Sequence, residues 1–95
     1  MIKVIFRKWR DGGDIIALFP EIPADCTGYE CLSYMHIGQH GAANPTILMA
    51  RTVPAAPDEY AELLDELKCI GYTDLQIVQR FSHNAFEKRW LQIKF

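Results

Sequence analysis

Residues 2–20 read IKVIFRKWRDGGDIIALFP, and this stretch decides the fold. Over 2–9, apolar and polar residues alternate and include β-branched and aromatic side chains, which is typical of a half-buried strand. The segment RDGGD at 10–14 contains Asp-Gly, a strong hairpin signal because glycine adopts a positive φ at low cost. Residues 14–20, DIIALFP, are expected to form the returning strand and to end it at Pro20. The N-terminus therefore predicts two adjacent antiparallel strands.

Three further strands are predicted downstream. Their ranges are 29–37 (YECLSYMHI), 46–53 (TILMARTV) and 74–81 (DLQIVQRF). Alternation in the first of these places Ser33 on one face, and Tyr34 and His36 on the other. The second is predicted from its apolar density, although Leu-Met-Ala would also suit a turn of helix.

The segment PAAPDEYAELLDELKCIGY at 54–72 carries the clearest helix pattern. Pro57 suits the first helical position, and Gly71 stands where a helix-terminating glycine is expected. One apolar face repeats at 3.6-residue spacing and consists of Tyr60, Leu63, Leu64, Leu67 and Ile70. The opposite face is acidic and is expected to be solvated, with Glu62, Asp65 and Glu66. This helix is long enough to cover one face of a sheet.

A second, short helix is predicted at the C-terminus, where Asn84 and Glu87 occupy the N-cap and N3 positions of a capping box. The order of four strands, a helix, a strand and a helix predicts an α+β fold. We expect a mostly antiparallel sheet of four to five strands, packed by one long amphipathic helix, with a short C-terminal helix. A chain of 95 residues without a linker or an internal repeat predicts a single domain over 1–95.

The composition disfavours several classes of protein. Ten basic and 12 acidic residues leave a net charge of −2, unlike the strongly basic surface of proteins that bind nucleic-acid backbones. Early charged residues leave no apolar region for a signal peptide, and no apolar run nears the ~20 residues that span a membrane. Three cysteines without CxxC spacing predict free, buried or half-buried thiols in a reducing compartment. We therefore expect a complete, cytoplasmic chain that does not bind membranes and is not suited to nucleic acid.

Residues 33–45, SYMHIGQHGAANP, form the least ordinary stretch of the chain. His36 and His40 are four residues apart, which on a helix would pair them as zinc ligands, but the neighbouring glycines disfavour a helix. No metal and no other cofactor is therefore predicted. Catalysis by Ser33 or Cys31 with a histidine base is also disfavoured, because alternation separates Ser33 from His36 and no nucleophile-elbow motif is present. No catalytic residue is assigned, and the sequence leans away from an enzyme without deciding the matter.

The same stretch fits a binding loop better. Its glycines and alanines let backbone N–H groups approach a ligand, and its histidines, glutamine and asparagine offer directional hydrogen bonds. These features predict a pocket for a small anionic, nucleotide-like ligand, with an arginine to balance its charge. The predicted ligand-binding residues are Ser33, Tyr34, His36, Gly38, Gln39, His40, Gly41, Asn44 and Arg51. Because one small subunit has little room for a cleft, we expect a homo-oligomer with the pocket near a subunit boundary. A tight structural turn is the alternative interpretation.

Two long strings, IFRKWRDGGDIIALFPEIPAD at 5–25 and YECLSYMHIGQHGAA at 29–43, stand beside the shorter PDEY at 57–60 and IGY at 70–72. In these strings the chain resembles short uncharacterised proteins of bacteriophages and mobile elements of gut bacteria. The resemblance implies a small accessory protein in the cytoplasm of the host bacterial cell. It also implies an anti-defence role exerted by binding, such as sequestering a nucleotide immune signal or blocking a host defence protein.

Two other functions stay open beside this leading hypothesis of a non-catalytic, ligand-binding protein. In the first, the 33–45 segment is structural, and an aromatic and basic surface at 8–10 (KWR) and 87–90 (EKRW) inhibits a host defence protein. In the second, the protein is a small hydrolase that uses Cys31, Ser33 or a histidine.

Overall fold

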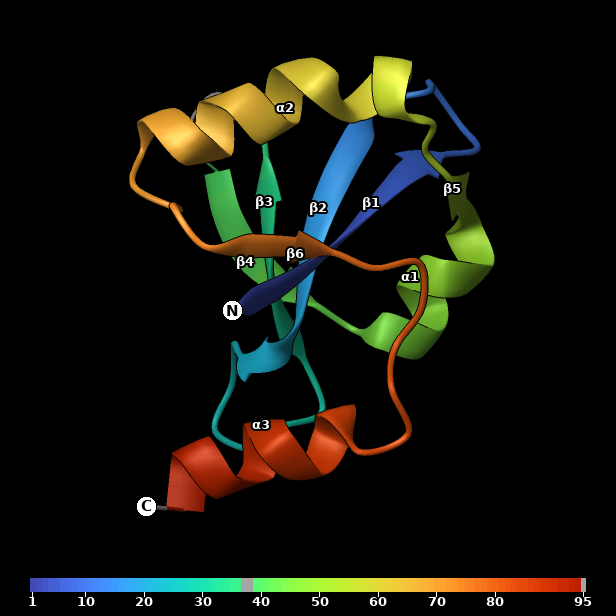
Figure 1. Ribbon diagram of the computed structural model, residues 1–95. Coiled ribbons are helices and arrows are strands. Elements are labelled where there is room, and N and C mark those ends of the chain that lie inside the picture. Colours follow the sequence, from blue (N-terminus) through green and yellow to red (C-terminus); the bar gives the residue numbers. More distant parts are fainter. Residues whose placement is uncertain (37–38, 95) are drawn as a thin grey trace.

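A computed structural model describes residues 1–36 and 39–94 of the chain. In chain order its elements are β1 (Ile2–Trp9), β2 (Ile15–Pro23), β3 (Cys31–Met35), β4 (Gln39–Ala43), α1 (Pro45–Arg51), β5 (Thr52–Pro54), α2 (Pro57–Cys69), β6 (Leu75–Ile77) and α3 (Ala85–Lys94). The strands occupy the centre of the molecule, α2 crosses above them, α1 lies to one side, and α3 lies below, next to the C-terminus (Figure 1). No described helix is long and apolar enough to cross a membrane.

The six strands form one sheet in the order β4-β3-β2-β1-β5, and β6 also pairs with β1. All neighbouring strands are antiparallel except β1 and β6, which run parallel. The α+β class and the mostly antiparallel sheet are confirmed, with six strands instead of four to five. The N-terminal hairpin is confirmed as well. Its turn is closed by a 2.8 Å hydrogen bond from the Trp9 N–H to the Asp14 carbonyl, and Gly12 and Gly13 have φ of 86° and 75°.

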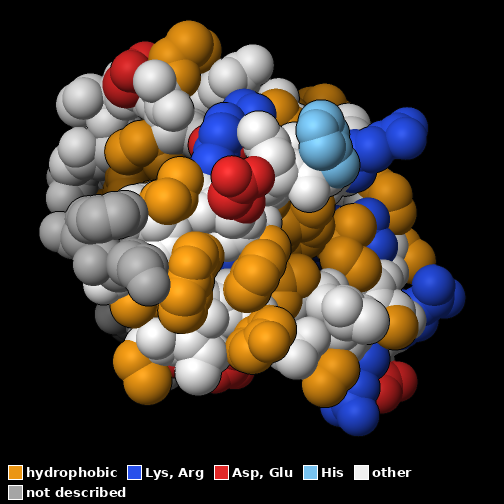
Figure 2. Space-filling model, turned by 90° about the horizontal axis from the view of Figure 1, so that it is seen from below, with side chains coloured by type: hydrophobic (Ala, Val, Ile, Leu, Met, Phe, Trp, Pro, Cys, Tyr) orange, Lys and Arg blue, Asp and Glu red, His pale blue; other side chains and the backbone are white. Residues whose placement is uncertain are grey.

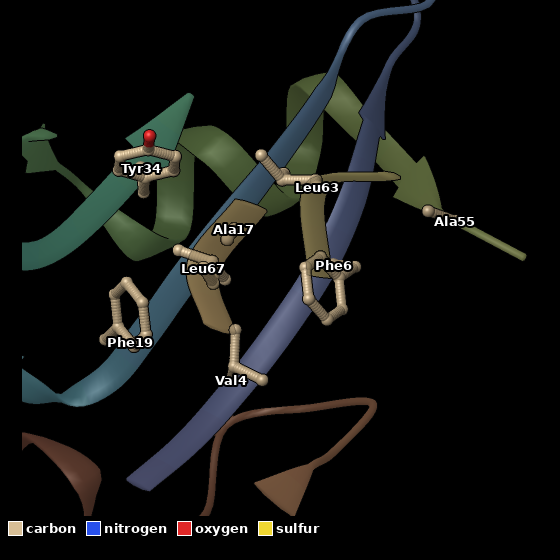
Figure 3. Packing of buried hydrophobic residues seen from close by; sticks show 8 residues of the cluster. All are labelled: Val4, Phe6, Ala17, Phe19, Tyr34, Ala55, Leu63 and Leu67. Atoms are coloured by element: carbon tan, nitrogen blue, oxygen red, sulfur yellow. The ribbon is translucent and has the colours of Figure 1, made fainter. Parts of the chain in front are cut away.

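Each face of the sheet carries its own apolar core. The first cluster lies between the sheet and α2 and consists of Val4, Phe6, Ala17, Phe19, Tyr34, Ala55, Leu63 and Leu67 (Figure 3). The second cluster lies on the opposite face, against α1, and consists of Ile5, Ile16, Leu18, Cys31, Ala43 and Leu48. Full burial of one leucine, isoleucine or phenylalanine side chain contributes about 1.5–3 kcal/mol. The two clusters therefore hold α1 and α2 on opposite faces of the sheet.

Helix α2 begins and ends where the sequence predicts. Pro57 is its first residue, and the Glu59 carboxylate accepts a 2.9 Å hydrogen bond from the Ala56 N–H, which would otherwise lack a partner. Gly71, just past the end of the helix, has a φ of 121°, a conformation that favours glycine. Local sequence signals therefore determine both ends of this element.

The expected single long helix is not observed. Helix α2 has 13 residues, and the other two described helices, α1 and α3, are shorter still. Leu63 and Leu67 of α2 are buried in the first cluster, whereas Ile70, predicted on the same apolar face, is 49% exposed. The helix stops before Ile70 could turn toward the sheet, since that residue is its C-cap.

Residues 46–53, predicted as a strand, instead form most of α1 and the start of β5. The Asn44 side chain accepts a 3.2 Å hydrogen bond from the Ile47 N–H, and Pro45 occupies the first helical position. Both are features of a helix start. Most of the apolar residues that suggested a strand belong to a helix, and Leu48 among them is buried against the sheet. The strand prediction is therefore wrong over the residues of α1.

The stretch 33–44, interpreted as a binding loop that begins within the predicted strand 29–37, contains two paired strands. Strands β3 and β4 pair over five residues each, with Ser33 opposite Gly41 and Tyr34 opposite His40. The strand prediction is confirmed over Cys31–Met35, whereas the loop prediction is wrong over Gln39–Ala43. Glycine and alanine are depleted in strands, so β4 is stabilised by its pairing with β3 and not by local propensity.

Other strands differ from the prediction in extent. Strand β2 continues past Pro20 to Pro23, with a register shift between Phe19 and Pro23 that accommodates the irregular backbone. Strand β6 covers Leu75–Ile77, whereas a strand was expected over 74–81. Strand β3 is likewise shorter than expected.

A buried arginine attaches α3 to the sheet. Arg89 is 4% exposed, and its Nε donates to the Gly28 carbonyl at 2.8 Å while its Nη1 donates to the Pro20 carbonyl at 2.6 Å. Gly28 has a φ of 79° and lies directly against α3, where an added Cβ would meet the Trp90 backbone nitrogen at 3.5 Å. The loop before β3 and the end of β2 are therefore held by one side chain of α3.

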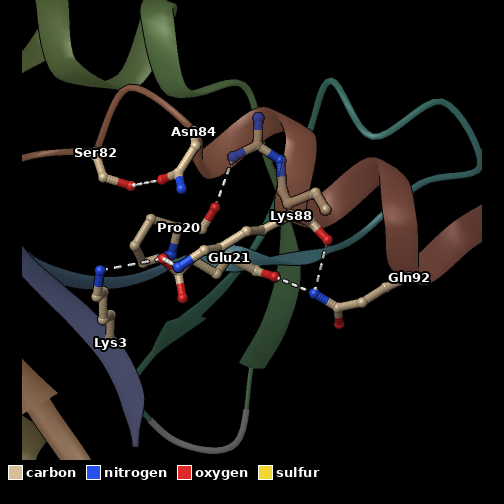
Figure 4. A network of polar contacts seen from close by, with 8 residues as sticks. Lys3, Pro20, Glu21, Ser82, Asn84, Lys88 and Gln92 are labelled. Atoms are coloured by element: carbon tan, nitrogen blue, oxygen red, sulfur yellow. Dashed lines mark hydrogen bonds and ion pairs between the residues drawn. The ribbon is translucent and has the colours of Figure 1, made fainter.

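Glu21 adds surface contacts beside this anchor (Figure 4). Its carboxylate lies 3.2 Å from the Lys3 ammonium and 3.0 Å from the Lys88 ammonium, so it links β1, β2 and α3. Burial alone would raise the pKa of Glu21, but the hydrogen bonds from Lys88 and Lys3 lower it below its ordinary value. Glu21 is therefore a carboxylate at neutral pH.

Candidate functional site

Strand alternation divides the predicted ligand residues between two faces of the β3–β4 hairpin. Ser33 and Gly41, which oppose each other, lie on the face of the second core cluster, beside Ala43. Tyr34 and His40, the next pair, lie on the face of the first cluster. The structure therefore does not bring all eight of the predicted residues that it describes into one pocket.

A groove lies between the hairpin and α1, on the face of the sheet that carries the second core cluster. Its volume is about 660 Å³. The apolar residues that line it are Trp9, Ile16, Met35, Ala42, Ala43, Ile47 and Leu48, and the predicted ligand residues that line it are Ser33, Gln39, His40, Gly41 and Asn44. His40 borders the groove although its ring contacts Tyr34 and Tyr72 on the other face. We call this cavity the hairpin groove. It joins residues of β1, β2, β3, β4 and α1, so it depends on the tertiary fold.

The polar groups of the hairpin groove are only partly used by the protein. The Ser33 hydroxyl donates to the Gly41 carbonyl at 3.0 Å, and Asn44 Oδ1 caps α1. Trp9 Nε1 is buried and has no hydrogen-bond partner among residues 1–36 and 39–94. Buried indole N–H groups normally have a partner. Trp9 therefore lines the groove as a residue, while its unsatisfied N–H lies beneath the surface.

On the opposite face, polar side chains tie the hairpin to α2 and the turn after it. The Tyr34 hydroxyl donates to Glu66 Oε2, and His36 Nδ1 lies 2.5 Å from Glu66 Oε1. His40 Nε2 lies 2.9 Å from the Tyr72 hydroxyl, and the His40 ring meets the Tyr34 ring edge-on with centroids 4.7 Å apart. We call these five residues the polar bridge. Both described histidines of the motif are thus engaged in contacts between elements.

Sequence reasoning missed two members of the polar bridge, Glu66 and Tyr72. Glu66 was expected on a solvated helix face, yet its side chain is 21% exposed and accepts from two hairpin residues. Tyr72 stacks on Phe19 with ring centroids 4.9 Å apart, and burial raises the pKa of its hydroxyl. The aromatic residue beside the helix-ending glycine was the available signal for Tyr72. Glu66 has no such signal, because its partners lie some 30 positions away along the chain.

The geometry does not assemble a nucleophile and base from the motif. Cys31 is completely buried, and burial raises the pKa of its thiol to about 11, so it is protonated at neutral pH. Ser33 directs its hydroxyl to a backbone carbonyl, and the His36 and His40 side chains lie on the other face of the hairpin. Nucleophilic catalysis needs both groups within hydrogen-bond reach. The arrangement therefore lends no support to the hydrolase hypothesis.

The remaining predicted residues lie outside the groove or outside the described chain. Arg51 is the last residue of α1, is exposed, and does not line the hairpin groove. Gly38 lies outside the described residues. Within the described chain, no group of three or more Cys, His, Asp or Glu side chains is placed to hold a metal ion. Of the three thiols, Cys26 and Cys69 are exposed and free, which corrects the expectation of buried or half-buried cysteines.

Comparisons with protein-family models, with curated proteins and with solved structures found no match to this chain. The predicted relation to phage and mobile-element proteins therefore stays a prediction. The functional assignment below depends on the shape and chemistry of the described residues.

Proposed function

We propose that the protein binds a small, uncharged, planar molecule of the nucleoside class in the hairpin groove. The observation that carries this proposal is the combination of an apolar wall and few polar groups in one cavity of about 660 Å³. Ligand sites in proteins commonly have this composition, with apolar surface for affinity and a few polar groups for orientation. Trp9 supplies an aromatic side chain, and Gln39 and Asn44 supply amides.

Charge favours a neutral ligand over the anionic one expected from the sequence. Among the described residues, no lysine or arginine lines the groove, so a phosphate would lack a cationic partner from this part of the chain. On the other face of the hairpin, a cavity of about 330 Å³ is lined by Asp14, Glu59 and Glu62. These carboxylates repel anions. We therefore retain the nucleoside part of the expected ligand and omit its phosphates.

Fluorescence of Trp9 tests the proposal. The chain has two tryptophans, Trp9 and Trp90, and Trp90→Phe leaves Trp9 as the reporter in the groove. We expect adenosine or guanosine to quench this emission saturably, and AMP to do so more weakly. Binding of AMP without binding of adenosine would contradict the neutral ligand, and a lack of response to every nucleoside would contradict the proposal.

A pair of substitutions to leucine supplies the matched control. Gly41 lines the groove, and a Cβ added there would meet Ser33 Oγ at an ordinary 3.6 Å, so Gly41→Leu fills the groove without backbone strain. Ala61 is an exposed residue of α2 and does not line the groove. Gly41→Leu is expected to abolish binding, whereas Ala61→Leu leaves it intact. Equal effects of the two variants would place the ligand elsewhere.

A second candidate function, binding to a protein partner, is favoured by an exposed aromatic patch next to α3. Tyr29 is 66% exposed and stacks on Phe86 with ring centroids 5.2 Å apart, while Phe86, Trp90 and Leu91 are 43%, 40% and 47% exposed. Figure 2, which views the molecule from below, shows hydrophobic side chains gathered on that side. Contiguous exposed apolar patches mark interaction sites. Loss of a purified partner's binding in Phe86→Asp, with binding kept in Gly41→Leu, would favour this candidate.

The predicted basic contribution to this surface is reduced in the structure. Arg89 is buried against two carbonyls, and Lys88 is paired with Glu21. The patch is therefore mainly aromatic. The anti-defence role, the phage origin and the cytoplasmic location stay predictions.

A further inference from the structure

Strand β4 has an open edge. It pairs with β3 through five consecutive residues without a register shift, and no described strand pairs with its other side. Its first four residues, 39–42, are exposed. The opposite edge of the sheet is different, because it consists of two three-residue strands, β5 and β6, that both pair with β1. The outer side of β4 is therefore the longest open strand edge in the described part of the chain.

The hydrogen-bonding alternation of the sheet determines which backbone groups point outward. The Trp9–Asp14 hydrogen bond defines which residue pairs of β1 and β2 exchange hydrogen bonds. Carried through the register of β2, β3 and β4, this alternation directs the N–H and C=O groups of Gly41 toward β3. Those of His40 and Ala42 point away from the sheet. They are the groups that an added strand would pair with.

The edge also lacks the features that usually protect an exposed strand. Natural edges carry lysine, proline, inward-pointing charges or bulges that prevent pairing with another chain. Residues 39–43 read QHGAA and contain no proline, lysine, arginine, aspartate or glutamate. In contrast, β5 ends in Pro54. The strand is therefore competent for pairing from the side that faces away from β3.

The sequence of β4 is complementary to itself. In an antiparallel pair of two copies centred on Gly41, His40 faces Ala42 of the partner subunit, and Gln39 faces Ala43 of the partner subunit. Each larger side chain thus meets a small one, and Gly41 meets its own copy without a side chain. No like charges oppose each other. His40 and Ala42, whose backbone groups point outward, are the residues that exchange hydrogen bonds in this register.

Exposed apolar side chains flank the edge on both faces of the sheet. Ile47 is 54% exposed and lines the hairpin groove beside β4. Ile70 is 49% exposed and lines, together with His40, a cavity of about 510 Å³ on the other face. A large exposed isoleucine on each face of the sheet beside this open strand edge favours coverage by another protein surface. A second copy supplies the same apolar groups from its own side.

We propose that β4 pairs antiparallel with β4 of a second copy, so that two six-stranded sheets join into one continuous sheet across a two-fold axis at Gly41. A second copy fits this edge because the register that satisfies the outward backbone groups also pairs large with small side chains. The hairpin groove borders β4 and would lie beside the subunit boundary. The pairing itself needs no ligand, so it stands apart from the proposed function.

Sedimentation velocity and light scattering of the ligand-free protein test the pairing. We expect a mass twice that of the 10.9 kDa chain, with dissociation on dilution. Ala42→Pro removes an outward N–H without removing a bond to β3 and is expected to halve the mass. Ala42→Ser, which keeps that N–H, is the matched control and is expected to stay dimeric.

A second variant keeps the test decisive if Ala42→Pro does not fold. Gly41→Asp places two carboxylates opposite each other on the proposed axis and is also expected to give monomers. Circular dichroism checks that both variants keep the native secondary structure. A wild-type chain that is monomeric at every concentration would overturn the pairing. So would a folded Gly41→Asp variant that remains dimeric, because the dimer would then use another surface.

Discussion

The two faces of the β3–β4 hairpin use the same short sequence in different ways. On the face of the polar bridge, Tyr34, His36 and His40 contact Glu66 and Tyr72 and join the hairpin to α2. On the face of the hairpin groove, the small residues leave a cavity that is also lined by Trp9. The residues that look most reactive in the sequence therefore make contacts within the fold, and the small residues between them border the cavity in which we propose that a ligand binds.

Removal of the aromatic ring of Tyr34 is expected to change the stability of the protein more than substitution of Glu66 or Ser33. Tyr34 is 1% exposed and belongs to the first core cluster. We expect Tyr34→Ala to lower the free energy of unfolding by about 3–5 kcal/mol, the range for truncating a large buried aromatic side chain. Urea denaturation measures the loss. A loss below about 1 kcal/mol would mean that this face of the hairpin does not support the fold.

Removal of the Glu66 charge at the centre of the polar bridge is expected to cause the second largest loss of stability. Glu66→Gln weakens the acceptor of both Tyr34 and His36, so we expect a loss of about 1–3 kcal/mol in unfolding free energy. Glu62→Gln, an exposed change on the same helix, is the control and should stay within about 0.5 kcal/mol of wild type. Equal values for the two variants would show that the bridge is not a stabilising contact.

A substitution on the groove face is expected to destabilise the protein less than either substitution on the face of the polar bridge. Ser33→Ala removes one hydroxyl that donates to the Gly41 carbonyl, and we expect a loss of about 0.5–1.5 kcal/mol in unfolding free energy. The same urea experiment compares it directly with Tyr34→Ala. If Ser33→Ala were the more destabilising of the two, the assignment of structural and open faces would be reversed.

Thiol labelling tests the burial of the core beneath the groove face without a substitution. The pKa of Cys31, on the groove side of β3, rises from 9.0 to about 11, so its thiolate fraction at about pH 8 falls about 100-fold. A thiol reagent should therefore modify Cys26 and Cys69 quickly and Cys31 only after unfolding. The stabilisation from a neutral Cys31 is complete below pH 9 and is lost as the pH rises toward 11. Prompt labelling of all three thiols would show that the groove opens through to the core.

Much of the fold could be predicted because its signals are local. The Asp-Gly turn, the proline and glycine at the ends of α2 and the alternation in β3 act within a few residues, and each is observed. Strand β4 and helix α1 could not be predicted this way. Gly41 and Ala42 favour a strand only through pairing with β3, and the apolar run of α1 fits either element until Asn44 caps it.

The candidate site was predictable only in part. Alternation correctly separated Ser33 from Tyr34 and His36, which disfavours a Ser33–His36 catalytic pair. The groove wall depends on Trp9 and Ile47, which are distant in sequence from the motif and meet it only after folding. The acceptor for the tyrosine and histidine, Glu66, is likewise a long-range partner.

Amide and indole NMR spectra recorded during an adenosine titration test the central claim most directly. The account predicts that the Trp9 indole N–H resonance shifts, together with the amides of Ser33, Gly41 and Ile47. The amides of Glu66 and Tyr72 and the Trp90 indole are predicted to stay in place. Shifts at Glu66 and Tyr72 without shifts at Trp9 would contradict the account, because the ligand would then bind the face that we assign to structure.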